Sequence, residues 1–125
     1  MKKIHFVWLD DERPIRDAYK TILNKATPHY CDIAGWSLCR TGEEAIKELA
    51  SLSKISNCKI FISFDHDLGQ GINGYDVAKW IIENEIQIAG FTVHSMNPVG
   101  RQNIISLLTH YGYKEMTYYS DIINF

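Results

Sequence analysis

Short apolar runs alternate with amphipathic segments along most of the chain, and this alternation restricts the fold more than any other feature. The clearest example is the stretch from Lys59 to Ile82. It opens with an apolar run, Ile60 to Phe64, whose length and β-branched and aromatic content predict a buried strand. It ends in a segment, Tyr75 to Ile82, whose apolar residues recur at helical spacing. The pattern therefore predicts a strand, a loop and a helix in succession.

The same pattern recurs before and after this unit. We expect further strands at 3–9, 32–40, 91–94 and 115–119, and helices at 16–25, 41–52 and about 102–111. Strands that alternate with helices imply βαβ units and a parallel sheet. Five such units predict a flavodoxin-like α/β fold, a three-layer sandwich with strand order 2-1-3-4-5. The tail after Tyr119 is too short for a full helix, so we expect the last helix to be truncated.

Length, charge and cysteine content limit the class of protein. A chain of 125 residues is typical of one domain, here expected to span residues 1–125. Its formal net charge of −2 gives no general attraction for nucleic acid, so duplex DNA is not an expected partner. The sequence has no 18-residue apolar run and no signal-peptide pattern, which favours a cytoplasmic protein without a membrane span. Three cysteines without C-x-x-C spacing indicate buried or half-buried thiols.

Polar clusters follow three of the predicted strands. Asp10 and Asp11 come directly after the first, Asp65-His66-Asp67 after the third, and His94-Ser95 ends the fourth. In the predicted strand order these three strands are neighbours, and the carboxyl ends of parallel strands share one edge of the sheet. We therefore expect the clusters to converge. Carboxylate oxygens suit a hard divalent cation, so Asp10, Asp11 and Asp65 are the predicted ligands of Mg²⁺ or Mn²⁺.

Structural explanations for the same residues remain open. Asp11 and Pro14 suit the start of a helix, and Asp67 suits a helix cap. His66 alternates with Asp65 along the strand, so its side chain can point away from a metal. Asn97-Pro98 is a strong turn former, and Asn97 can have that function alone. On the second strand, Trp36 and Leu38 are expected to face inward.

The sequence resembles the receiver domain of response regulators. WLDDE matches the acid pair that holds Mg²⁺ in receivers, SFDHDLGQGINGYDVAKWI resembles their phosphoacceptor strand and turn, and His94-Ser95 falls where they place a phosphoryl-contacting Ser or Thr. The chain departs from receivers at the end of the fifth strand, where Tyr118-Tyr119-Ser120 replaces their Lys. The combination LDDERP, FDHDLG, GYD and HSMNPVGRQNI is more similar to a receiver-derived group, the cyclic-phosphate-processing receiver domains. That resemblance implies action on cyclic phosphates of nucleotides or RNA ends.

The main functional hypothesis is a metal-dependent phosphodiesterase. Asp65, Asp67, His66 and His94 are its expected catalytic residues, because imidazoles near one phosphate can take and give protons at neutral pH. The predicted substrate contacts are Ser95, Asn97, Arg101, Asn103 and Arg13. Arg101 can bind a non-bridging oxygen, and the start of the helix that follows Pro98 offers backbone N–H groups to an anion.

Two alternatives use the same residues. In the first, Asp65 accepts a phosphoryl group and the domain is a signalling switch; the missing Lys of the fifth strand argues against it. In the second, the pocket binds and sequesters a cyclic nucleotide without turnover. The truncated last helix leaves a flank of the sheet that a second copy of the chain could cover, so a homo-oligomer is compatible with the sequence.

Overall fold

The computed structural model of the protein describes residues 2–11, 31–69 and 71–116. These residues form four strands and three helices, which are β1 (Lys2–Leu9), β2 (Cys31–Cys39), α2 (Gly42–Leu52), β3 (Cys58–Phe64), α3 (Gly74–Glu83), β4 (Gly90–Val93) and α4 (Pro98–His110). The predicted helix at 16–25 and the chain after Met116 lie outside this description. Within the described ranges, no helix is long and apolar enough to cross a membrane.

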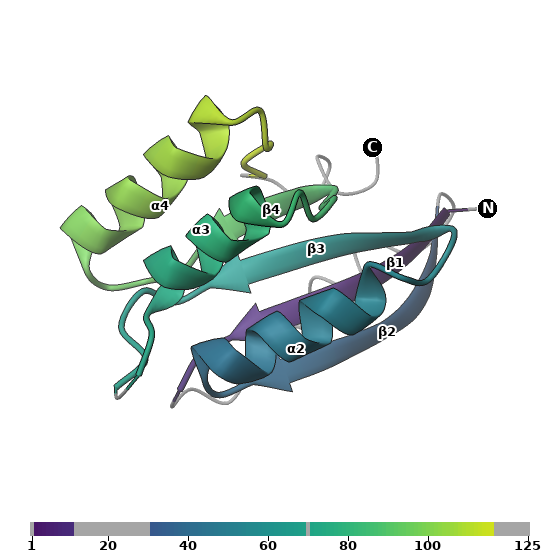
Figure 1. The fold of residues 1–125 in the computed structure, drawn as a ribbon, viewed down its shortest axis with the longest axis horizontal. Helices are drawn as coiled ribbons and strands as arrows, with labels where there is room; N and C mark the ends of the chain where they lie inside the picture. The colour runs from purple at the N-terminus through teal and green to yellow at the C-terminus, as the bar shows by residue number, and fades with distance from the viewer. Residues whose placement is uncertain (1, 12–30, 70, 117–125) are drawn as a thin grey trace.

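The four strands form a parallel sheet in the order β2-β1-β3-β4 (Figure 1). This order confirms the predicted doubly wound α/β fold. The expected fifth strand is represented by a parallel bridge between Phe91 of β4 and Glu115, while residues 117–119 are not described. Because all the strands run the same way, their carboxyl ends share the edge at the left of Figure 1.

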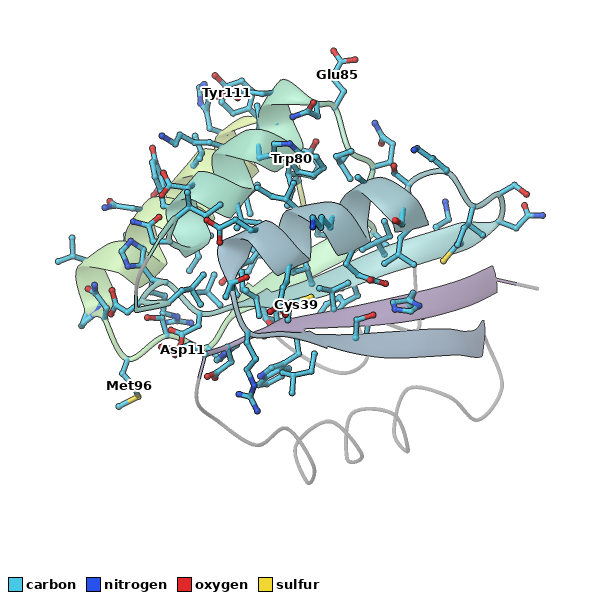
Figure 2. The ribbon with its side chains drawn as sticks, turned by 60° about the horizontal axis from the view of Figure 1, so that its bottom comes forward. Asp11, Cys39, Trp80, Glu85, Met96 and Tyr111 are labelled. Carbon is cyan, nitrogen blue, oxygen red and sulfur yellow. The ribbon has the colours of Figure 1, made fainter. Side chains whose placement is uncertain are left out.

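The three described helices cover one face of the sheet, as Figures 1 and 2 show. The sequence places apolar residues at alternate positions of each strand, and those on this face meet the apolar stripes of the helices. The largest fully buried members of this core are Leu9, Leu49, Ile60, Ile62, Phe64, Ile81, Phe91, Ile104 and Leu108. On the other face, Phe6 packs edge-on against Phe61, with ring centroids 5.5 Å apart.

Each helix begins at a residue whose side chain caps it. Thr41 Oγ1 accepts the Glu44 N–H of α2, and Asn73 with Asp76 forms a reciprocal capping box at the start of α3. Helix α4 begins four residues earlier than predicted, because Asn97 accepts the Gly100 N–H and Pro98 fits the first helical turn. Gly112, with φ of 89°, follows the end of α4 as predicted.

One predicted core position is wrong, and the thiols are as expected where they are described. Leu38 is 38% exposed, because it lies on the edge strand β2 and faces away from α2. Nothing is described of the Trp36 and Cys31 side chains. Cys39 is a buried free thiol, and burial together with Glu48 and Glu44 raises its pKa to about 12, so it is a poor nucleophile. Cys58 is half-buried.

A polar cluster connects α2 to the sheet. Ser37 Oγ donates to Glu48 Oε1 at 3.0 Å and lies 2.7 Å from His5 Nε2. The His5 side chain is 15% exposed. Burial lowers the pKa of His5, and the neighbouring Glu48 only partly opposes this effect. Protonation of His5 therefore favours the unfolded chain, where the imidazole is hydrated.

This cluster predicts an acid-sensitive stability. Because the pKa of His5 is lower in the folded state than in the unfolded chain, the stabilisation is complete above about pH 6.5 and is lost as the pH falls. Urea unfolding of the wild type and His5→Gln should show a steeper loss of stability between about pH 7 and about pH 5 in the wild type. His110→Gln, which removes an exposed histidine, is the control. Equal slopes for the wild type and His5→Gln would contradict this account.

Candidate metal centre at the carboxyl edge of the sheet

The candidate site lies directly after one row of paired residues on three neighbouring parallel strands. Leu9 of β1 pairs with Phe64 of β3, and Phe64 pairs with Val93 of β4. The residues that follow are Asp10, Asp65 and His94. Their backbone amides continue the register, since Asp65 N donates to Leu9 O at 2.8 Å and His94 N donates to Phe64 O at 2.9 Å. Three polar residues far apart in the sequence thus become neighbours on adjacent strands.

The three side chains converge at the end of the sheet. Each offers one ligand atom, and these atoms all lie within 4.8 Å of one another. Asp10 is 1% exposed and Asp65 is 8% exposed. Two buried carboxyl groups this close repel each other strongly when both are ionised, unless a positive charge lies beside them. The donor set therefore fits a divalent cation, and it is the candidate metal centre of the described residues.

The ring of His94 is held on three sides. Its Nε2 lies 3.0 Å from Asp10 Oδ2, and its Nδ1 lies 2.8 Å from Ser63 Oγ. Thr92 Oγ1 donates to Ser63 Oγ at 2.7 Å. The indole of Trp8 stacks on the imidazole, with centroids 4.3 Å apart and planes 14° apart. These contacts fix both the plane of the ring and the directions of its two nitrogens.

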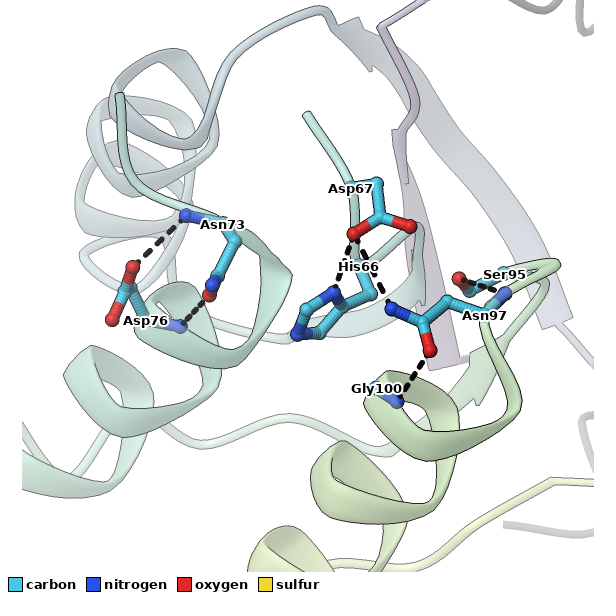
Figure 3. A network of polar contacts seen from close by, with 7 residues as sticks. All are labelled: His66, Asp67, Asn73, Asp76, Ser95, Asn97 and Gly100. Carbon is cyan, nitrogen blue, oxygen red and sulfur yellow. Dashed lines mark hydrogen bonds and ion pairs between the residues drawn. The ribbon is translucent and has the colours of Figure 1, made fainter. Parts of the chain in front are cut away.

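A second polar network lies where the loop after β3 meets the start of α4 (Figure 3). His66 Nδ1 lies 2.9 Å from Asp67 Oδ1, and Asn97 Nδ2 donates to the same oxygen at 3.4 Å. Because side chains alternate along a strand, His66 lies on the helix-covered face, opposite His94. A Cβ on Gly100 would lie 2.4 Å from the His66 ring, so glycine lets α4 approach the imidazole.

The pKa of the exposed Asp67 carboxylate lies below its ordinary value. The hydrogen bond from His66 lowers the pKa of Asp67, with a smaller contribution in the same direction from Asn97. Asp67 is 66% exposed. It is therefore an ionised acceptor at the rim of the site rather than part of the buried cluster.

The amino end of α4 faces this same edge of the sheet. The buried Ser95 accepts the Asn97 N–H through its Oγ at 3.1 Å, which forms the turn before the helix. Arg101 is exposed, and its Nε donates to Val93 O at 3.3 Å. The helix start thus places amide, hydroxyl and guanidinium donors beside the strand ends.

The structure does not bring every predicted site residue into the cluster. Asp11 is not a member; one of its carboxylate oxygens lies near Gly69, 3.5 Å from where a Cβ would be. Asn103 is exposed on α4, and Arg13 lies outside the described residues. The predicted set of three carboxylates is replaced by two carboxylates and an imidazole, because His94 and not Asp11 continues the register row.

Four residues that lie near the cluster were not predicted from the sequence to be part of the site. Ser63, Thr92 and Trp8 position His94, and nothing in their local sequence distinguishes them from ordinary strand residues. Arg40 follows β2 in the same register row, and its Nη1 donates to Asp10 O at 3.2 Å. A signal for Arg40 existed, because it follows the last apolar residue of a strand as Asp10 does.

The His66–Asp67 pair generates a prediction that NMR can check. Replacement of His66 by Phe removes the hydrogen bond that contributes most to the low pKa of Asp67, so that pKa should rise toward its ordinary value. Carboxyl ¹³C titration of the wild type, His66→Phe and the control His110→Gln measures the change. An unchanged Asp67 titration in His66→Phe would show that the contact is not maintained in solution.

The sequence comparisons give one family match. A sequence model of the cyclic-phosphate processing receiver domain matches residues 5–110. The search of curated proteins found no match.

Solved structures show the same fold at low sequence identity. One is a fusion protein with a trimeric coiled-coil segment of yeast Spc42; it is 23% identical, with a TM-score of 0.57 over 98% of this chain and 74% of that one. Another is the signal receiver domain of a modulated diguanylate cyclase from Desulfovibrio desulfuricans G20, 17% identical, with a TM-score of 0.54 over 82% and 74% of the two chains.

The family match covers β1 from His5 onward and all of β3, β4 and α4, the elements that carry the candidate metal centre. The chain therefore belongs to the family of cyclic-phosphate processing receiver domains.

Proposed function

We propose that this domain is a metal-dependent hydrolase that opens a cyclic phosphate of a nucleotide or of an RNA end. The observation that carries the proposal is the convergence of Asp10, Asp65 and His94 beside the amino end of α4. A cation bound by these residues would lie next to groups able to bind an anion, in a member of a family of cyclic-phosphate processing domains, which supports the proposal. A bound phosphodiester would contact both.

The two buried carboxylates would hold the divalent cation. Hydrogen bonds of the sheet register hold the backbone of Asp10 and Asp65, and Asp11, the next residue after Asp10, is the third carboxylate that we propose as a ligand. A cation bound there would polarise the phosphoryl oxygens and lower the pKa of a nearby water. The oxygen ligands suit Mg²⁺ or Mn²⁺.

The start of α4 would hold the phosphate. Pro98 has no N–H and the Gly100 N–H is bonded to Asn97, so the Val99 N–H and the positive end of the helix dipole would attract the anion. Ser95 and Asn97 would donate hydrogen bonds, and Arg101 would bind a non-bridging oxygen. Asn103 and Arg13 are the remaining proposed substrate contacts, with Arg13 a second contact to the phosphate.

Proton transfer would involve the two imidazoles and the rim carboxylate. The Nδ1–H of His66 donates to Asp67, so we assign Asp67 to positioning this imidazole and His66 Nε2 to the acceptance of a proton from the attacking water. His94 lies in the candidate metal centre, where it can either give a proton to the leaving alkoxide or hold the cation. Such acid–base groups typically contribute about 10²–10⁴-fold to the rate.

The proposal predicts metal-dependent turnover that requires Asp65. Incubation of 2′,3′-cyclic and 3′,5′-cyclic nucleotides and of RNA with a cyclic-phosphate end should give a ring-opened product with Mg²⁺ or Mn²⁺, and none with chelator. Asp65→Asn keeps the shape of the side chain but removes its charge, and should reduce kcat/KM by 100-fold or more, about 2.7 kcal/mol. The matched control is Glu83→Gln, an exposed carboxylate at the end of α3.

The other outcomes separate the alternatives. No turnover, with Asp65 phosphorylated by a small-molecule phosphodonor, would replace the hydrolase with a signalling switch. Tight binding of a cyclic nucleotide that is recovered unchanged would replace it with a sequestering module. Equal activity of Asp65→Asn and the wild type would remove the metal centre from the mechanism.

A further inference from the structure

The nitrogen in the cluster bears on which cation the site selects. A metal site built from carboxylates alone favours hard cations, but here His94 Nε2 lies among the oxygen ligands. Imidazole binds first-row transition-metal dications better than it binds Mg²⁺, which prefers oxygen and retains its waters. His94 therefore changes which cations the site prefers, relative to a site made of Asp10 and Asp65 alone.

The position of His94 fits direct coordination. Its Nε2 lies 3.0 Å from Asp10 Oδ2. Two ligand atoms that each lie about 2.1 Å from one cation, at right angles, are themselves about 3 Å apart. The same separation fits a hydrogen bond when no cation is bound, with Nε2–H donating to the carboxylate. The same ring position therefore suits the metal-free and the metal-bound site. A cation can replace the Nε2 proton without movement of the ring.

The contacts of Nδ1 allow this exchange. When Nε2 binds a cation, the ring proton must lie on Nδ1, where Ser63 Oγ at 2.8 Å can accept it. When Nε2 carries the proton instead, Ser63 can donate to Nδ1. Thr92 Oγ1, 2.7 Å from Ser63 Oγ, completes the chain in either direction, because both hydroxyl groups donate and accept. Ser63 is 3% exposed, so water does not substitute readily for this chain.

We propose that His94 Nε2 is a direct ligand of the cation, together with Asp10 and Asp65, and that it makes the site select a first-row transition-metal dication over Mg²⁺. Ser63 and Thr92 are positioning residues that hold the metal-binding tautomer, and the stacked Trp8 holds the ring plane. The inference rests on the metal site of the proposed function but not on turnover.

Mn²⁺ gives the most demanding test of a nitrogen ligand, because it binds nitrogen least strongly among the first-row dications. Calorimetry on the metal-free protein without substrate should show Mn²⁺ binding at least 10-fold tighter than Mg²⁺. Pulsed EPR of the Mn²⁺ complex should show the ¹⁴N coupling of a bound imidazole. His94→Gln should lose this coupling and most of the preference for Mn²⁺, while the exposed control His110→Gln should keep both.

Substitution of a positioning residue should weaken metal binding without removing the nitrogen ligand. Ser63→Ala should keep the ¹⁴N coupling but bind Mn²⁺ about 10-fold or more weakly, since loss of a partner of a metal-bound histidine typically costs 10–100-fold in affinity. Absence of ¹⁴N coupling in the wild type, or equal binding of Mn²⁺ and Mg²⁺, would overturn the inference whether or not any variant folds. Because no substrate is present, these results are independent of whether the protein hydrolyses a cyclic phosphate.

Discussion

The parallel register of β1, β3 and β4 is the constraint on which the rest of the site depends. Each strand ends at the same level, and the backbone hydrogen bonds continue for one more residue, so Asp10, Asp65 and His94 are neighbours. A shift of one residue in any strand would turn that side chain to the other face of the sheet. The apolar residues that precede each polar one fix the register by their burial, so the hydrophobic core and the candidate metal centre are parts of one arrangement.

The sheet separates two polar groups with different chemistry. Asp10, Asp65 and His94 lie on one face, where burial makes close carboxylates costly without a cation. His66 lies on the other face, against the first turn of α4, and holds the exposed Asp67. Gly74 brings α3 equally close to the end of β3, since a Cβ there would lie 2.1 Å from Asp65 O. Two helix starts thus support the strand end that carries Asp65.

The sequence predicted the features that depend on periodicity. The apolar runs identified the described strands to within two residues, and strand order followed from the βαβ pattern, so the convergence of the three polar clusters could be inferred. The alternation of Asp65 and His66 also indicated that their side chains point in opposite directions. The membership of Asp10 and Asp65 in the cluster is confirmed by the positions of their carboxylates.

Other features depend on contacts that no local pattern encodes. The choice of His94 over Asp11 follows from the register, which is a property of three strands and not of the residues themselves. Ser63, Thr92 and Trp8 are ordinary strand residues in sequence, and only the pairing of β1, β3 and β4 brings them around one imidazole. Helix α4 starts early because Asn97 and Pro98 form a cap as well as a turn. Leu38 is exposed because it lies on β2, an edge strand of the described sheet, and the apolar pattern does not show which strand is at the edge.

Anomalous X-ray diffraction from crystals that contain Mn²⁺ tests the central claim most directly, which is that Asp10, Asp65 and His94 form one metal centre. The account predicts a single strong anomalous peak at the carboxyl edge of the sheet, about 2.0–2.2 Å from a carboxylate oxygen of Asp10, an oxygen of Asp65 and Nε2 of His94. A peak bound by Asp11 or Asp67 and distant from Asp10 and His94 would contradict it, as would the absence of any peak at this edge.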